Sequence, residues 1–312
     1  MVTKPLSKLK LVASFLLLVA LLVGATACSS DKDKDKNKEA ATEIKNDKAE
    51  SIDLAQDGGE IVIGAEQEPD CVDFINTCSG SSWGFWMVAV QTLPRAYSAE
   101  RVGDQNVWET KITSLLASEP KLETDPVQKI TYQINPKAVW SDGVEITGAD
   151  FVYTWDQIAN GEDVYDRSGY KDVESVTVDP ADDHKVVVTM AKNYAGWKDL
   201  FGGNYGVLPS HILEGKDRNA EMKDGYTFSG GPFKLEAWNK GESIVLVPNE
   251  KYWGDKPVLD KVTFAIQADT VAEFKSFNAG EVSAIYPQPQ IAVIDSINSG
   301  LKDAKRIVNK DT

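Results

Sequence analysis

The segment 129–158 most constrains the fold, because strand, turn and helix signals follow one another directly within it. Apolar residues alternate with polar ones, as in a strand with one buried face, at Ile130, Tyr132 and Ile134. The Ser-Asp-Gly sequence at 141–143 predicts a turn. Thr147 and Asp150 then have the spacing of a helix capping box, and apolar residues follow at helical spacing at Phe151, Trp155 and Ile158. This segment therefore requires a fold that mixes strands and helices.

The same signals recur from residue 59 to the end of the chain. A further strand is expected at 61–63, a hairpin with strands at 173–178 and 186–188, a second hairpin within 231–249 that turns at 239–241, and another strand at 260–266. Further helices are expected at 86–93 and at 270–278, the second ending at Gly280, the residue type that best tolerates a left-handed cap. The last residues open as a strand and continue as helix and strand. The fold class is therefore α/β, or mixed α+β, with a body of about 250 residues that has room for two lobes.

Residues 1–27 have the features of a secretory signal peptide. Lysines precede an apolar run at 11–23 that is too short to span a bilayer, and small residues follow the run. Ordinary signal peptidase and lipoprotein processing would both leave Cys28 as the first residue of the mature chain. Ala25 stands where the commonest lipoprotein signal has leucine, so the junction alone leaves both routes open.

The segment 28–58 favours the lipoprotein route. It is charged and almost free of aromatic and branched residues, so it cannot bury enough surface to order itself. A flexible tether of about 30 residues has a mean reach of about 30 Å, enough to hold a folded body clear of a lipid surface. We expect a lipid anchor at Cys28 on the extracytoplasmic side of the cell membrane. A disordered tail without lipid is the alternative.

The charge of the mature chain disfavours polyanionic partners. Residues 1–27 hold three lysines and no acidic residue, so their removal would leave 30 basic and 48 acidic residues, a net charge of −18. Nucleic acid and anionic membrane surfaces are poor partners for such a chain. The charge identifies no substrate by itself, because salt screens it and solubility alone can account for it.

Cys71 and Cys78 are the two cysteines left after Cys28. In an exported protein we expect them to form a disulfide, with two free thiols as the alternative. A metal site is a poorer interpretation, because the two histidines of the chain, His184 and His211, do not lie near the pair in the sequence. We expect neither a metal nor a cofactor.

Two stretches of the chain carry a family resemblance. The sequences are WSDGVEITGADFVYTWD at 140–156 and GPFKLEAWNKGESIVLVPNEKYWGDKPVLDKVTFAI at 231–266, which DTVAEFKSFNAGEV follows at 269–282. They resemble the family 5 extracellular solute-binding proteins, the oligopeptide, dipeptide and nickel receptors of ABC importers. The likeness covers nearly everything from residue 59 onward. The stretch 68–97 further resembles an actinobacterial peptide-receptor branch.

The resemblance implies a periplasmic-binding-protein-like type II fold, in which two lobes close on a ligand. The first lobe would comprise 59–91 and 195–284, with a subdomain at 92–194, and the second lobe would begin at 285. Family members are considerably longer, so most of the second lobe is expected to be missing from a chain of 312 residues. Family peptide receptors commonly place the carboxylate for the peptide amino terminus on that lobe, so no residue here is given this role.

The loop 78–86 raises the question of a serine hydrolase. Gly80-Ser81-Ser82-Trp83-Gly84 matches the G-x-S-x-G of a nucleophile elbow, with Ser82 as nucleophile. Such an elbow needs a buried strand immediately before the serine, whereas the preceding residues here are polar and bracketed by cysteines. His184, in the turn 179–185, and His211, at an expected helix start, are better interpreted as ordinary surface or capping residues. An exported serine hydrolase is therefore an unfavoured alternative.

A binding loop fits the same residues better. Serine hydroxyls beside aromatic rings are the mixture expected of a concave site with a few polar anchors. The expected ligand contacts are Ser81, Ser82 and Trp83 in this loop and, by family position, Gly230, Gly231, Tyr286 and Gln288. Plain core packing remains the alternative for Trp83 and Tyr286, and a hairpin turn for Gly230.

The expected function is that of a monomeric lipoprotein receptor without enzymatic activity. It would capture oligopeptides by main-chain hydrogen bonds, close by a hinge motion and release the peptide to the ABC permease. An oligosaccharide receptor of the same family is the runner-up, since the eight tryptophans could stack on sugar rings. Most of the tryptophans, such as Trp140, Trp155 and Trp253, lie in family structural motifs instead. A lipid-anchored sensor or adhesin is a third interpretation.

Overall fold

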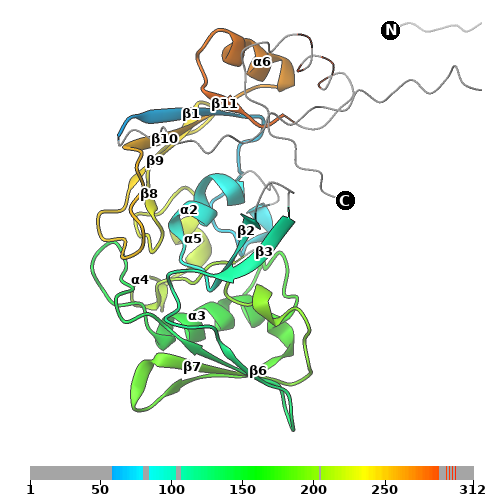
Figure 1. Ribbon diagram of the computed structural model, residues 1–312, viewed down its shortest axis with the longest axis vertical. Helices are drawn as coiled ribbons and strands as arrows, with labels where there is room; N and C mark the ends of the chain where they lie inside the picture. The colour runs from blue at the N-terminus through cyan, green and yellow to red at the C-terminus, as the bar shows by residue number, and fades with distance from the viewer. Residues whose placement is uncertain are drawn as a thin grey trace, which may run out of the picture. The chain divides into compact units, whose positions relative to one another are not determined.

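The computed structural model describes residues 58–79, 84–102, 107–203 and 205–287, and the single positions 293, 295, 297 and 299. The strands form a five-stranded sheet, a four-stranded sheet and a two-stranded hairpin, with short helices between them (Figure 1). The mixed fold class expected from the sequence is confirmed. Cys28 and the whole segment before Gly58 lie outside the described residues.

The five-stranded sheet joins the beginning and the end of the described chain. Its strands are β1 (Glu60–Ala65), β8 (Phe233–Asn239), β9 (Ser243–Pro248), β10 (Lys261–Ile266) and β11 (Ala284–Ile285), in the order β11-β1-β10-β9-β8. β1 pairs in parallel with both β10 and β11, whereas β8, β9 and β10 pair antiparallel. The expected strand at 61–63 and the expected hairpin within 231–249 are confirmed.

Helix α6 (Thr270–Asn278) connects β10 to β11 and contacts β1 and β11 (Figure 1). The Asp269 side chain caps its start by accepting a hydrogen bond from the Ala272 backbone N–H at 2.8 Å. Gly280, just beyond its end, has φ +74°, a left-handed conformation that glycine adopts without strain. The expected helix and its glycine stop are confirmed.

The four-stranded sheet is antiparallel throughout. It contains β4 (Lys121–Glu123), β5 (Lys129–Gln133), β6 (Val173–Asp179) and β7 (Asp182–Met190), in the order β4-β5-β7-β6. Helix α3 (Gly148–Ala159) packs against β6 and β7. The apolar residues that predicted this strand and helix are buried at Ile130, Tyr132, Ile134, Phe151 and Ile158. Their periodicity therefore identified the core faces correctly.

The start of α3 is fixed by one buried carboxylate. Thr147 and Asp150 form the capping box expected from their spacing, and the Thr147 backbone N–H donates to Asp150 Oδ2 at 3.1 Å. The Trp140 indole N–H donates to the same oxygen at 3.2 Å. Asp150 Oδ1 accepts hydrogen bonds from the Ser210 backbone N–H and hydroxyl at 2.7 and 2.8 Å. One side chain thus joins the turn, the helix and a distant loop.

The remaining elements are short. They are the 3₁₀ helices η1 (Thr77–Ser79), η3 (Tyr170–Asp172) and η4 (Trp197–Asp199), the π-helix η2 (Phe85–Ala89), the α-helices α2 (Val90–Thr92), α4 (Ser210–Leu213) and α5 (Arg218–Met222), and the hairpin strands β2 (Tyr97–Val102) and β3 (Val107–Ile112). The helix expected at 86–93 is therefore present, but mostly with the wider π geometry that periodicity does not distinguish.

Candidate functional site

The loop before the candidate binding residues is anchored by a disulfide. Cys71 and Cys78 are bonded, with their Cα atoms 5.8 Å apart, as expected from their isolation as a pair in an exported chain. Cys71 is fully buried. The loop is therefore held at both ends immediately before residue 80.

A buried ion pair ties this loop to the helices beneath it. Arg218 Nε on α5 lies 2.9 Å from Asp73 Oδ2, and both side chains are almost inaccessible. Arg218 Nη1 also donates to the side-chain oxygen of Gln157 on α3, at 3.1 Å. Burial raises the pKa of the Asp73 carboxyl, while the charge of Arg218 and its hydrogen bond act against this rise. These contacts fix the position of the loop relative to α3 and α5.

The expected contacts Ser81, Ser82 and Trp83 lie outside the described residues, and so does Gln288. Tyr286 is described and directly follows β11, with 61% of its surface exposed. The core alternative for Tyr286 is therefore wrong for the described chain.

Gly230 and Gly231 line a cavity of about 350 Å³. The cavity lies between the end of α2, the β2–β3 hairpin and the segment 252–255. Its lining combines aromatic rings with charged and hydroxyl side chains: Tyr252, Trp253, Arg95, Glu100, Asp255 and Ser114. A site with both signs of charge and a flat apolar wall suits a zwitterionic or amide-rich ligand.

The two glycines also have a packing role that the sequence did not indicate. The backbone N–H groups of Gly230 and Gly231 both donate to the Thr92 carbonyl, at 2.9 Å each. A Cβ on Gly231 would lie 2.3 Å from the Gln91 carbonyl oxygen, and one on Gly230 would lie 2.7 Å from the Pro94 ring. Both positions therefore require glycine, with or without a ligand.

The polar groups of the cavity wall are held by hydrogen bonds. Ser114 Oγ lies 2.9 Å from the Tyr252 hydroxyl, and the Trp253 indole N–H donates to the Ser114 carbonyl at 2.9 Å. Glu100 lies 3.7 Å from the ammonium of Lys111 across the hairpin. Burial lowers the pKa of the Arg95 guanidinium, which stays charged at neutral pH because its ordinary pKa is far above 7. The wall is therefore pre-organised and carries a buried positive charge.

One further carboxylate was missed by the sequence reasoning. Glu273 on α6 is completely buried, and its Oε1 accepts a hydrogen bond from the Tyr286 backbone N–H at 3.3 Å. Burial, and then the like charge of Glu66, raise the pKa of Glu273 to about 7. The signal that could have revealed it is a glutamate on the inner face of an amphipathic helix.

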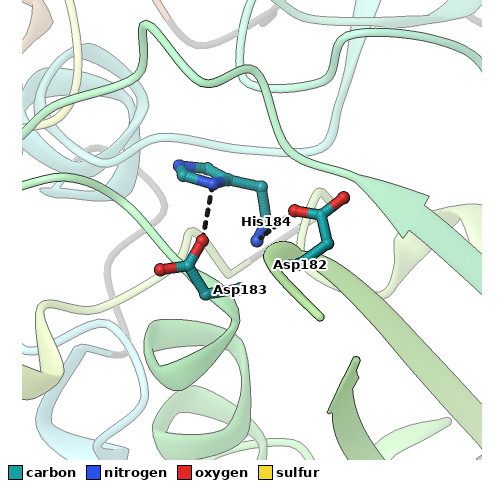
Figure 2. A group of neighbouring side chains, drawn as sticks. All are labelled: Asp182, Asp183 and His184. Carbon is teal, nitrogen blue, oxygen red and sulfur yellow. Dashed lines mark hydrogen bonds and ion pairs between the residues drawn. The ribbon is translucent and has the colours of Figure 1, made fainter. Parts of the chain in front are cut away.

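Among the described residues, Asp182, Asp183 and His184 form a group whose potential ligand atoms lie within 4.8 Å of one another, close enough to hold a metal ion (Figure 2). His184 Nδ1 lies 2.8 Å from Asp183 Oδ1. Asp182 accepts a hydrogen bond from the His184 backbone N–H at 3.0 Å and another from the Gln133 side chain at 3.1 Å. These hydrogen bonds join the three residues to one another and to β5 at the start of β7, while His184 Nε2 is buried without a hydrogen-bond partner among the described residues. We assign the cluster a role in the hairpin. The expectation of a turn residue at His184 is wrong, since it lies within β7 and is mostly buried.

The described surroundings give no support to a nucleophile elbow at Ser82. β1 ends at Ala65, and the element closest before the serine is the 3₁₀ helix η1 rather than a strand. His211 Nε2 lies 2.9 Å from Asp142 Oδ2, and His184 pairs with Asp183. His211 is the second residue of α4, which agrees with the expectation that it lies at a helix start. His211 on α4 is thus paired with a carboxylate of the turn 141–143, and His184 with its neighbour in β7.

No helix in the described ranges combines the length and the apolar character needed to cross a membrane.

Comparison with known sequences identifies relatives over most of the chain. The pattern of the bacterial extracellular solute-binding proteins, family 5 Middle, matches residues 111–309. The oligopeptide-binding protein OppA of Mycobacterium tuberculosis is 33% identical over 219 residues, which cover 69% of this chain and 36% of OppA. The probable monoacyl phosphatidylinositol tetramannoside-binding protein LpqW of the same species is 33% identical over 152 residues, 47% of this chain and 23% of LpqW. The chain thus spans about a third of the length of OppA.

Solved structures share the fold. The periplasmic EDTA-binding protein EppA superposes with a TM-score of 0.69 at 28% identity, covering 78% of this chain and 46% of EppA. The oligopeptide-binding protein AppA of Bacillus subtilis, solved with a nonapeptide, gives a TM-score of 0.63 at 22% identity, covering 73% of this chain and 44% of AppA. The mixed α/β fold is therefore that of part of a type II periplasmic binding protein. The chain belongs to the bacterial extracellular solute-binding proteins of family 5.

Proposed function

We propose that this chain is part of the oligopeptide receptor of an ABC importer. The receptor captures peptides outside the cytoplasmic membrane, to which Cys28 anchors it, and delivers them to the permease. The observation that carries this proposal is the 33% identity to OppA over 69% of the chain. The fold shared with AppA, which was solved with a nonapeptide, is compatible with it.

The proposed ligand contacts come from three parts of the sequence. Ser81, Ser82 and Trp83 follow the anchored loop, while Gly231 packs on the Gln91 backbone a few residues further along. Tyr286 and Gln288 are proposed contacts where the chain leaves β11. Main-chain hydrogen bonds would hold an extended peptide without reading its sequence, and water-filled pockets would receive its side chains.

The lobe division is part of the same proposal. The five-stranded sheet takes its strands from 59–91 and 195–285, and the four-stranded sheet lies within 92–194. These are the segments assigned above to the first lobe and to its subdomain, apart from one residue at the boundary. Closure by a hinge would need a second lobe, so we propose that binding is a property of the whole receptor.

A sugar-containing ligand is the second candidate. LpqW is named for binding a tetramannoside, and it is as identical to this chain as OppA over a shorter stretch. Against this candidate, Trp140 is fully buried and its indole N–H donates to Asp150, so its ring is not available for stacking on a sugar.

Calorimetry of the whole receptor tests the two candidates directly. We expect heat of binding from a pool of peptides of mixed sequence and none from manno- or cello-oligosaccharides. The Trp83→Ala variant should bind the peptides about tenfold more weakly, equivalent to about 1.4 kcal/mol. Trp108→Ala, an exposed tryptophan of the β2–β3 hairpin, serves as the matched control. Sugar binding without peptide binding would replace the first candidate with the second.

A further inference from the structure

The carboxyl groups of Glu66 and Glu273 meet where three segments of the described chain converge. Glu66 follows β1, Glu273 lies in the first half of α6, and the residue whose backbone N–H reaches Glu273 is Tyr286, directly after β11. Glu66 Oε1 accepts a hydrogen bond from the Thr270 hydroxyl at 2.5 Å, which holds it against the start of α6. The pair therefore joins β1, α6 and β11.

Glu273 approaches β1 at Gly64, where the strand has no side chain. A Cβ on Gly64 would lie 3.0 Å from Glu273 Cγ and 3.2 Å from Ile285 Cγ2. A side chain at position 64 would therefore push the buried glutamate or β11 away from this strand by a few tenths of an ångström. The contact is thus built into the backbone of the sheet.

The charge balance at this contact is unfavourable for two carboxylates. Glu273 Oε2 is buried and has no hydrogen-bond donor among the described residues. The other ionisable groups on α6 and on the strands beside it are Asp269 at the helix cap, the exposed Lys275, Glu60 paired with Lys261 at the far end of β1, and the exposed Tyr286 phenol. A proton on Glu273 supplies the missing donor, since the Glu66 side chain lies within hydrogen-bonding reach of it.

We propose that Glu66 and Glu273 share one proton, and that this proton holds α6 and the last strand, β11, against β1. When the O–H bond breaks and the proton passes to solvent, two carboxylates repel each other at a buried contact and the junction loosens. The raised pKa of Glu273, about 7, places this change near neutral pH. The proposal concerns a conformational device and does not depend on which ligand the receptor binds.

Hydrogen exchange of the segment 282–287 between pH 5 and pH 8 tests the proposal on the whole protein. The opened state exposes a glutamate of ordinary pKa, so it binds fewer protons than the closed state in this range. After correction for intrinsic exchange rates, the opening equilibrium should increase roughly tenfold per pH unit up to about pH 7 and level off above it. The protection of the Tyr286 amide should fall accordingly.

Three variants separate this mechanism from general pH effects. Glu273→Gln should give a flat profile, because an amide has no proton to lose, and Glu66→Gln should move the levelling point to lower pH by removing the like charge. Glu236→Gln, an exposed glutamate on β8 of the same sheet, should behave as wild type. An unchanged slope in Glu273→Gln, or a flat wild-type profile, would overturn the proposal. Should Glu273→Gln not fold, a carboxyl ¹³C titration of the wild type decides: a midpoint near 7 supports the shared proton and one near 4.5 refutes it.

Discussion

Arg218 and Asp73 form an ion pair that solvent hardly reaches, with side-chain exposures of 3% and 1%. Desolvating two charges costs more than their attraction returns unless hydrogen bonds satisfy the remaining donors. Here Gln157 and Asn219 accept from the other guanidinium nitrogens. The pair therefore fixes the disulfide loop to α3 and α5. Its contribution to the free energy of unfolding depends on both partners being present.

Arg218→Met should destabilise the protein by about 3 to 5 kcal/mol, because it leaves the Asp73 charge buried without a partner. The loss should be smaller at acidic pH. Without Arg218 the pKa of Asp73 rises further, and a neutral carboxyl costs less to bury. Urea unfolding at pH 5 and pH 8 measures this. Lys216→Met, in an exposed pair with Glu221, is the control and should change stability by less than about 0.5 kcal/mol. Equal losses in the two variants would contradict the argument.

Gly231→Ala tests whether the glycine pair is required by packing. The added Cβ would lie 2.3 Å from the Gln91 carbonyl oxygen. This oxygen belongs to the backbone, which cannot move out of the way as easily as the end of a flexible side chain. We expect a loss of about 2 kcal/mol or more in the free energy of unfolding, without any ligand present. Gly203→Ala, whose Cβ would lie 3.3 Å from its nearest neighbour, should cost clearly less. A stable Gly231→Ala protein that fails only in binding would make the glycine a ligand residue alone.

At the scale of elements, Asp150 determines how α3 begins. Its two oxygens accept four hydrogen bonds, from Trp140, Thr147 and Ser210, at distances between 2.7 and 3.2 Å. Ser210 starts α4, so the same carboxylate also positions the segment that carries His211. The helix, the turn and the α4 segment should therefore lose order together when the carboxylate is removed.

Asp150→Ala should lower the free energy of unfolding by about 3 to 4 kcal/mol, since it leaves several buried donors without acceptors. Asp156→Ala, on the exposed face of the same helix, removes only a hydrogen bond to Asn160 and should cost less than about 1 kcal/mol. Thermal unfolding of both variants, followed by tryptophan fluorescence because Trp140 reports the site, provides the comparison. A loss in Asp150→Ala no larger than in Asp156→Ala would show that the network adds little.

Sequence patterns predicted the regular elements because each pattern is local. The alternation at 130–134, the capping box at Thr147 and the glycine after α6 each depend on residues a few positions apart, and all are present in the structure. The π geometry of η2 and the strand position of His184 were missed, because both are decided by tertiary packing. The cavity and the Glu66–Glu273 contact were also missed, since they join residues far apart in the chain.

At the scale of the whole molecule, the first described strand pairs on both sides with the last two described strands. β1 lies between β10 and β11, so the sheet forms only when residues about 200 positions apart pair with each other. Hydrogen bonds also hold the start of the described chain, because the Gly58 and Gly59 backbone N–H groups donate to Val258 and Asp260.

The lipid anchor and the folded body should be separable by mutation. If Cys28 carries the lipid, Cys28→Ser should release the protein from the membrane fraction. The free energy of unfolding should stay within about 0.5 kcal/mol, because the sequence predicts that residue 28 begins a charged tether outside the folded body. A variant secreted by a different signal peptide and starting at Gly58 should be equally stable and also unanchored. Fractionation, mass spectrometry of the mature amino terminus and urea unfolding test both variants. Membrane retention of Cys28→Ser would refute the lipid anchor, whereas a large loss of stability would show that the tether takes part in the fold.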